Sequence, residues 1–371
     1  MKNIIIVGGG LAGLITSLQL QATGAQITLV ERKQYPFHRV CGEYISNEVK
    51  PFLRKLGVNL EVLQPANINQ FLLSSPAGKT LKAPLDLGGF GVSRYSFDDY
   101  LYQLAQARGV QFILNTSVTD VKFSADQFSV FLSDNRQLTA DLVIGAYGKR
   151  ANLDRHLQRS FFQKRSPYLA VKYHIRTDFP RNLIALHNFK DGYAGISAIE
   201  NDKYCFCYLT TRSNLKKHGT IAKMEEAVLQ QNPLLKQIFN ESDFLYEQPE
   251  VINEISFAPK RCIENHILMC GDAAGLITPL CGNGMAMAIH GAKIISDQVT
   301  LYLQGRYTRL QLEQAYSQHW QKQFNARLQV GRFIQSLFGR PILSEATVAL
   351  LRTMPSAVQF LMKNTHGKAF D

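Results

Sequence analysis

Four closely spaced glycines in VGGGLAGLI, residues 7–15, place the strongest constraint on how this chain folds. Residues 4–7 read IIIV, a β-branched run that predicts a strand buried on both faces. Gly8, Gly10 and Gly13 fit the spacing GxGxxG, which permits a tight turn, close approach to a pyrophosphate, and close packing of a helix on the strand. The helix that follows would direct free N–H groups at the phosphates. The sequence therefore predicts a nucleotide-binding unit at its N-terminus.

A second strand with an acidic end supports this interpretation. Residues 27–31 read ITLVE, and Glu31 lies 23 positions after Gly8. In dinucleotide-binding folds an acidic residue about 20 positions on binds a ribose hydroxyl. A lone GxGxxG is a weak signal, but strand, helix, second strand and acid together predict a bound nucleotide. NAD and FAD both remain open at this point.

A second glycine-rich segment, HILMCGDAAGLITPLCGNGMAMAIHGAKIISD at residues 266–297, favours FAD over NAD. A short apolar strand runs into Gly271 and Asp272, and an aspartate at a strand end can accept hydrogen bonds from a sugar-alcohol chain. A long helix starts near Asn283 after a loop, and its N-terminus can stabilise negative charge on a ring system. These are the requirements of a ribityl chain and of a reduced flavin.

With these motifs the chain resembles FAD-dependent oxidoreductases of the aromatic-hydroxylase type, over about residues 1–305. Within them it is most similar to the geranylgeranyl-reductase-like and polyketide-tailoring branch. The stretch GVSRYSFDDYLYQLAQARG fits the family's VxRxxLxxxL-like helix, with Arg94 at the arginine, and the residues alone predict Ser96 as its N-cap. The resemblance implies Asp272 on the ribityl chain, Arg94 near the diphosphate or ribityl region, and Arg39 on the adenosine side.

The implied cofactor is FAD, held by both glycine-rich segments, the arginines and the intervening strands. The residues expected to contact it are Gly8, Gly10, Leu11, Ala12, Gly13, Glu31, Arg32, Arg39, Gly42, Arg94, Val118, Gly148, Gly271, Asp272, Pro279, Gly282, Asn283, Gly284 and Met285.

The stretch RVCGEYIS, residues 39–46, supplies the catalytic candidates. In geranylgeranyl-reductase-like relatives the cysteine of the corresponding CG pair sits beside the isoalloxazine, and Cys41 matches it. Cys41 is predicted either to form part of the wall against the ring or to donate a proton, since a thiol can donate when its surroundings tune it. Glu43 is the neighbouring candidate for proton handling. The six cysteines form no CxxC pair and no zinc-like cluster with histidine, so no metal site is predicted.

The chain departs from the family at two motifs. Tyr147 replaces the aspartate of the usual GADG, which the resemblance ties to nicotinamide use, so NAD(P)H is only one candidate electron donor. Residues 192–200, GYAGISAIE, lack the Trp and Pro of the YxWxFP motif found in many geranylgeranyl reductases. This second departure weakens an assignment to prenyl-chain reduction.

The predicted fold class is α/β: a Rossmann-like FAD-binding domain with an inserted β-sheet substrate domain and a C-terminal helical segment. His174, His187 and Tyr193 are candidate wall residues of the substrate cavity. The predicted divisions are 1–75, 94–160 and 255–305 for the FAD-binding domain, 76–93 and 161–254 for the substrate domain, and 306–371 for the helical segment.

Charge and hydropathy limit the choice of partners. The net charge is +12, but the basic residues are scattered and no nucleic-acid motif is present, so no nucleic-acid partner is predicted. No apolar run approaches the roughly 20 residues of a membrane span, and we expect a cytoplasmic protein. An apolar stripe with arginines at 324–340 either packs on the core or lies on a membrane surface. The oligomeric state is not predicted.

The leading functional prediction is a monooxygenase or hydroxylase of secondary metabolism, acting on a hydrophobic polyketide- or isoprenoid-like molecule. A flavin-dependent reductase of carbon–carbon double bonds is the alternative. A non-catalytic FAD-binding scaffold is an alternative of another class, motivated by Tyr147. An NAD-only dehydrogenase does not explain Gly271 and Asp272.

Overall fold

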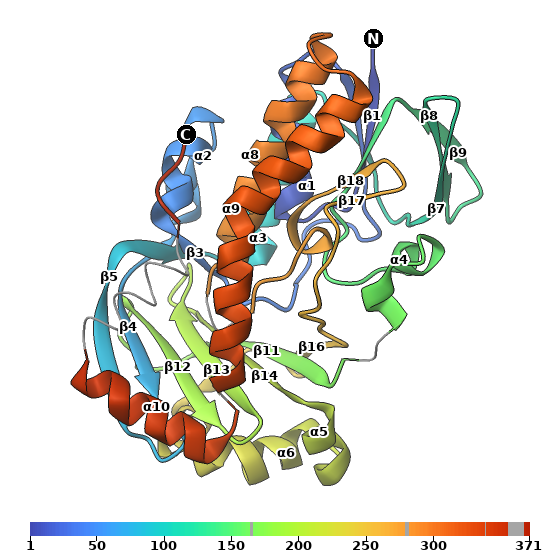
Figure 1. Ribbon diagram of the computed structural model, residues 1–371. Coiled ribbons are helices and arrows are strands. Elements are labelled where there is room, and N and C mark those ends of the chain that lie inside the picture. Colours follow the sequence, from blue (N-terminus) through green and yellow to red (C-terminus); the bar gives the residue numbers. More distant parts are fainter. Residues whose placement is uncertain (164–165, 279–281, 338, 355–366) are drawn as a thin grey trace.

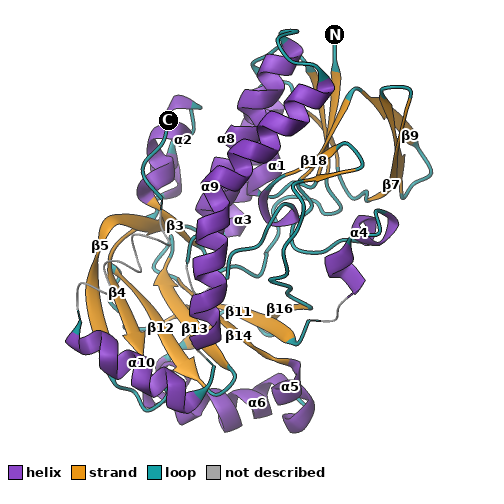
Figure 2. Cartoon of the chain, in the orientation of Figure 1, coloured by secondary structure: helices purple, strands orange, loops and turns teal. Residues whose placement is uncertain are grey.

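A parallel sheet and a larger, mainly antiparallel sheet form the two halves of the molecule (Figure 1). The computed structural model describes residues 1–163, 166–278, 282–337, 339–354 and 367–371. The long C-terminal helix α9 (Arg309–Leu337) runs from one half to the other (Figure 2). The predicted α/β class, with an inserted sheet and C-terminal helices, is confirmed.

The smaller sheet has six strands in the order β17-β18-β10-β1-β2-β6, of which only β17 is antiparallel to its neighbour. The predicted first strand is present, and residues 4–7 are all buried. Helices cover one face of this sheet and a separate three-stranded sheet covers the other. The β-branched side chains of β1 are therefore buried on both faces, as the sequence predicts. The strands are β1 (Asn3–Val7), β2 (Gln26–Val30), β6 (Gln111–Ile113), β10 (Leu142–Gly145), β17 (Ile263–Glu264) and β18 (Ile267–Met269).

Helix α1 packs between α3 and α8 on one face of this sheet, while β8 and β9 of the three-stranded sheet contact the other face. The predicted N-cap of α3 was wrong: Ser93 caps the helix, and its hydroxyl accepts a hydrogen bond from the backbone N–H of Ser96. The elements are α1 (Leu11–Gln21), α3 (Arg94–Ala107), α8 (Gly284–Leu303), β7 (Val118–Ser124), β8 (Gln127–Leu132) and β9 (Gln137–Ala140).

The larger sheet has nine strands, in the order β15-β11-β14-β13-β12-β4-β5-β3, with β16 paired to β11. Its members are β3 (Tyr44–Ser46), β4 (Ala66–Ser74), β5 (Thr80–Gly91), β11 (Tyr168–Arg176), β12 (Leu183–Phe189), β13 (Gly192–Ala198), β14 (Tyr204–Thr211), β15 (Asp243–Phe244) and β16 (Glu250–Asn253).

The division at residue 75 differs from the observed topology. Strands β3 and β4 lie before residue 75, yet they pair with β5, and β4 also pairs in parallel with β12. The insert also carries three helices, which supply part of a second core: α5 (Arg212–His218), α6 (Ile221–Val228) and α7 (Pro233–Glu241).

The C-terminal helices are α9 (Arg309–Leu337) and α10 (Pro341–Thr353), and shorter helices are α2 (Lys50–Lys55) and α4 (Asn152–His156). Helix α9 packs on α8, and α10 contacts β5 and β12. Beyond the gap at 355–366, the backbone of Phe370 donates to the carbonyl of Glu48 and accepts from the N–H of Phe52. No helix in the described part of the chain is long and apolar enough to cross a membrane.

Candidate functional site

A cavity of about 770 Å³ is lined by residues of both sheets and of the C-terminal helices. Of the sequence-predicted residues, Gly13 does not line it and Pro279 lies outside the described residues. The others all do: Gly8, Gly10, Leu11, Ala12, Glu31, Arg32, Arg39, Cys41, Gly42, Glu43, Arg94, Val118, Gly148, Gly271, Asp272, Gly282, Asn283, Gly284 and Met285. The fold thus brings positions 8 and 285 to one cavity, while the contact of each residue with FAD stays a prediction.

Gly13 allows α1 to pack closely against the glycine turn. A Cβ atom at Gly13 would lie 2.0 Å from the carbonyl oxygen of Gly8, so any other residue would push α1 away from the turn. Gly8 itself has a φ of +104°, which disfavours residues with a side chain. This is the close packing that the GxGxxG spacing predicts, and it directs the N-terminus of α1 at the cavity.

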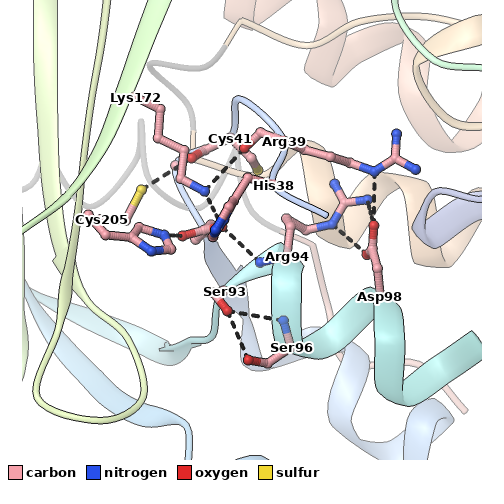
Figure 3. Close-up of polar contacts among 12 residues, drawn as sticks. His38, Arg39, Cys41, Ser93, Arg94, Ser96, Asp98, Lys172 and Cys205 are labelled. Atoms are coloured by element: carbon pink, nitrogen blue, oxygen red, sulfur yellow. Dashed lines mark hydrogen bonds and ion pairs between the residues drawn. The ribbon is translucent and has the colours of Figure 1, made fainter. Parts of the chain in front are cut away.

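Arg39 joins two carboxylates beside the turn, Glu31 and Asp98, and sequence reasoning missed Asp98. The buried Glu31 carboxylate accepts from the N–H of Gly9 at 2.8 Å and from Arg39 Nη2 at 3.2 Å. Asp98 accepts from Arg39 Nε at 3.0 Å, and from Nε and Nη2 of Arg94, both at 2.7 Å (Figure 3). Asp98 lies four residues after Arg94 on α3, a spacing that could have identified it.

Lys260 links two loops that contribute Lys149 and Asp272 to the cavity lining. Its ammonium donates to the carbonyl of Lys149 at 2.7 Å and to that of Asp272 at 2.8 Å. Burial lowers the pKa of Lys260 to about 8. The loop after β10 and the loop after β18 are therefore joined by one side chain, which no sequence motif marked.

Tyr147 occupies the position of the missing aspartate and lines the cavity. Its hydroxyl donates to Asp154 Oδ1 at 3.0 Å and accepts from Arg159 Nη1 at 3.2 Å. Arg159 also donates to Asp154 at 3.0 Å and to the carbonyl of Ala273 at 3.0 Å. A carboxylate is thus present nearby, but it is fully buried and turned toward Arg159.

Glu43 is fully buried and is held by three donors. Its carboxylate accepts from Lys172 Nζ at 2.5 Å, from His174 Nε2 at 2.6 Å, and from the backbone N–H of Arg94 at 2.8 Å. Burial alone would raise the pKa of Glu43, but Lys172 and His174 outweigh it and lower the pKa to about 2. Glu43 is therefore a carboxylate with both oxygens occupied.

The same contacts fix the loop that carries Cys41. Lys172 also donates to the carbonyl of Arg39 at 3.1 Å, and Cys205 Sγ donates to the carbonyl of Cys41 at 3.2 Å. Figure 3 shows Lys172 and Cys205 on one side of this loop and Arg94 on the other. Glu43 has a φ of +56°, a left-handed conformation that a non-glycine residue adopts only when its surroundings hold it. Strand β11 of the large sheet, through Lys172 and His174, thus holds the loop after β2 in place.

The predicted wall residues divide between the cavity and the protein interior. Tyr193 lines the cavity, whereas His174 binds Glu43. His187 is buried away from the cavity lining, with its Nδ1 2.9 Å from Ser74 Oγ. His38, which was not predicted, lines the cavity and its Nδ1 lies 2.9 Å from Tyr246 Oη. Burial, followed by the charge of Lys172, lowers the pKa of His38 to about 4.

The half of the cavity over the large sheet is mainly apolar. Eight of its apolar side chains come from five different elements, so no single periodic pattern in the sequence predicted this surface. They are Phe71 and Leu73 of β4, Leu81 and Leu85 of β5, Ile184 and Leu186 of β12, Ile334 of α9 and Leu351 of α10. No group of three or more His, Cys, Asp or Glu side chains suited to a metal ion occurs among the described residues.

Comparisons with known proteins identify the family to which the chain belongs. A family model described as "FAD binding domain" matches residues 1–324. The conditioned medium factor receptor 1 of Dictyostelium discoideum is 21% identical, over 94% of this chain and 73% of that protein. The digeranylgeranylglycerophospholipid reductase of Methanocaldococcus jannaschii is 25% identical, over 77% and 74%. The aurachin C monooxygenase/isomerase of Stigmatella aurantiaca is 22% identical, over 84% and 86%.

Solved structures match the fold over the whole chain. The flavin-dependent brominase Bmp2 superposes with a TM-score of 0.79 at 17% identity, over 100% of this chain and 94% of that one. At this identity the likeness concerns the fold alone.

Proposed function

Since this chain belongs to the FAD-binding-domain family of flavoproteins, and is an FAD-dependent oxidoreductase, we propose that it is a monooxygenase acting on an apolar small molecule of secondary metabolism. The observation that carries this proposal is the apolar half of the cavity, which is continuous with the nucleotide half at the Cys41 loop. Such a compartment favours a hydrophobic, polyketide- or isoprenoid-like substrate and keeps water from the reacting atoms.

The residues present fit FAD. The glycine turn and the N-terminus of α1 suit a diphosphate, Glu31 suits a ribose, and Asp272 with the N-terminus of α8 suits a ribityl chain and ring. When bound, FAD supplies the redox chemistry, including reaction with oxygen. This chain's part is to position the substrate, exclude water and hold protons where they are needed.

Glu43 bears on the choice between oxygenation and double-bond reduction. Adding hydrogen across a carbon–carbon double bond needs a proton delivered to carbon, in addition to a hydride. With its pKa lowered to about 2 and three donors around it, Glu43 is a poor proton source near neutral pH. This favours the monooxygenase, with Glu43 acting as a residue that positions the Cys41 loop.

The reductase remains a second candidate because Cys41 lines the cavity and carries a thiol. The similarity to a digeranylgeranylglycerophospholipid reductase over 77% of the chain also favours it. In that case the Cys41 thiol would be the proton donor, and it would be reprotonated from solvent after each turnover.

The electron donor and the location are part of the same proposal. Tyr147 and the buried Asp154–Arg159 pair leave no carboxylate free at the position tied to nicotinamide use, so we propose reduced flavin or a protein donor ahead of NAD(P)H. The described cysteines are all free, as in a reducing compartment, which supports a cytoplasmic enzyme.

An oxygen-isotope experiment tests the reaction type. The purified protein is incubated with FAD, reduced anaerobically with NADH, NADPH or reduced flavin, and then given a panel of apolar phenols and polyprenyl compounds in two parallel arms, one under labelled dioxygen and one without oxygen. One labelled oxygen atom in the product supports the monooxygenase. A saturated product formed without oxygen rejects it in favour of the reductase, and colourless protein that takes up no FAD rejects both in favour of a scaffold.

A further inference from the structure

Large apolar side chains are concentrated on the surface between residues 333 and 354, at the end of α9 and along α10. The seven other exposed large apolar residues of the described chain are scattered between residues 1 and 310. The concentrated ones are Phe333 (61% exposed), Ile342 (88%), Leu343 (36%), Leu350 (59%) and Met354 (46%). Soluble monomeric proteins seldom expose a cluster of large apolar side chains unless the cluster forms a binding surface.

The opposite face of α10 borders the cavity. Ser344 and Val348 are fully buried, and Leu351 lines the cavity together with Ile334 of α9. These positions on α10 recur at the spacing of one helix face. Figure 1 shows α10 at the periphery of the large sheet, where it contacts β5 and β12, and remote from the parallel sheet. One helix therefore separates the apolar cavity from an apolar outer surface.

The surface around these side chains is basic. Arg340 and Arg352 are exposed, and Arg332 is partly so. Between residues 314 and 354 the sequence has a single acidic residue, Glu345. Glu345 is already engaged, because it accepts from the N–H of Ala77 at 2.6 Å and lies 4.0 Å from Lys79. The net charge of the chain, +12, has the same sign.

We propose that the outer face of α10, with the end of α9, docks on an anionic lipid surface, from which the apolar substrate enters the cavity. Apolar side chains flanked by arginines are the composition that inserts at the boundary between headgroups and acyl chains. Basic residues add attraction to anionic lipids. The inference deepens the proposed function, on which the entry of substrate rests, and it names the source of the substrate as a membrane.

Vesicle sedimentation of the 371-residue chain, incubated with FAD and freed of unbound flavin, tests this. Vesicles of phosphatidylcholine alone are compared with equimolar phosphatidylcholine and phosphatidylglycerol, at low and high salt. We expect binding to the mixed vesicles, weaker binding at high salt, and little binding to phosphatidylcholine alone. The double variant I342S/L350S should bind the mixed vesicles at least about tenfold more weakly, because two inserted side chains are lost.

Leu310→Ser is the matched control, because Leu310 is 64% exposed at the start of α9, away from this surface. The proposal is overturned if wild-type protein stays in the supernatant with mixed vesicles at low salt, or if L310S weakens binding as much as the double variant. It is also overturned if I342S/L350S instead converts a dimer to a monomer in sedimentation velocity. Flavin absorbance in the same samples distinguishes the two proposals. Protein that contains flavin but does not bind vesicles refutes membrane docking alone. Protein that binds vesicles but contains no flavin refutes the proposed oxidoreductase function alone.

Discussion

Replacing Lys172 with methionine should destabilise the protein strongly, because it leaves the Glu43 carboxylate buried without its counter-charge. The pKa of Glu43 falls from its ordinary 4.5 to about 2 in the folded protein; burial opposes this change, and Lys172 and His174 cause it. At about 1.4 kcal/mol for each unit of pKa, this preference for the ionised form amounts to about 3 kcal/mol. Removing one partner of a buried ion pair costs about 3–5 kcal/mol in other proteins, so both routes give the same size of effect.

The pH dependence has a definite sign. Because the pKa of Glu43 is lower in the folded than in the unfolded state, its contribution to stability is present above pH 4.5 and is lost as the pH falls toward 2. Wild-type protein should lose this stability on acidification, and the K172M variant should lose less, since it no longer has the lysine that favours the carboxylate.

Urea unfolding at neutral pH, followed by the fluorescence of the single tryptophan, Trp320, and by flavin absorbance, measures the effect. K172M should lower the free energy of unfolding by about 3 kcal/mol, and the double variant E43Q/K172M by less than the sum of the two single changes. Lys2→Met is the matched control, because Lys2 forms a half-exposed pair with Asp141 at 2.8 Å, and such pairs contribute at most about 1 kcal/mol. A K172M effect no larger than the control, or additive single changes, would refute the account of Glu43.

Substitutions at three further positions have defined outcomes. Cys41→Ser should keep normal FAD content and turnover if Cys41 only forms the wall, whereas loss of turnover with full FAD content in both Cys41→Ser and Cys41→Ala would assign it the proton transfer. Lys260→Met should weaken FAD binding at least about tenfold in a fluorescence titration, because the ammonium no longer holds the Asp272 loop; unchanged affinity would contradict that role. Tyr147→Phe should lower the free energy of unfolding by about 1–2 kcal/mol in urea, since Asp154 loses a donor, while FAD content stays unchanged.

Local signals in the sequence selected residues that the fold brings together in one part of the cavity, while their contact with FAD stays a prediction. The glycine turn, Glu31 and the segment around Asp272 each sit where a strand ends, and strand ends of a parallel sheet meet at one edge. Consequently residues as far apart as Gly8 and Met285 line one cavity, although each was identified from its own neighbourhood.

Long-range pairing explains what the sequence did not predict. Glu43 and Lys172 are 129 positions apart, and nothing near either residue shows that they form an ion pair. Strand β4 alternates like many strands, but only its partners β5 and β12 place it in the large sheet. The N-cap of α3 was misplaced for a local reason: Ser96 has Asp99 three residues later, the spacing of a capping box, whereas the observed cap, Ser93, has no acidic residue at that spacing.

Charged side chains around the Cys41 loop are bound to other protein groups, and this limits which of them can transfer a proton during the reaction. Among the described residues, Glu43 is held by Lys172 and His174, and Arg94 by Asp98. Such saturated groups fix geometry and are poor at moving protons, because each transfer would break a buried charge-assisted contact. The Cys41 loop is held through its backbone carbonyls, which leaves the half-buried thiol at the cavity wall. We therefore infer that the choice between the two proposed reactions, oxygenation and double-bond reduction, depends on whether the Cys41 thiol donates a proton.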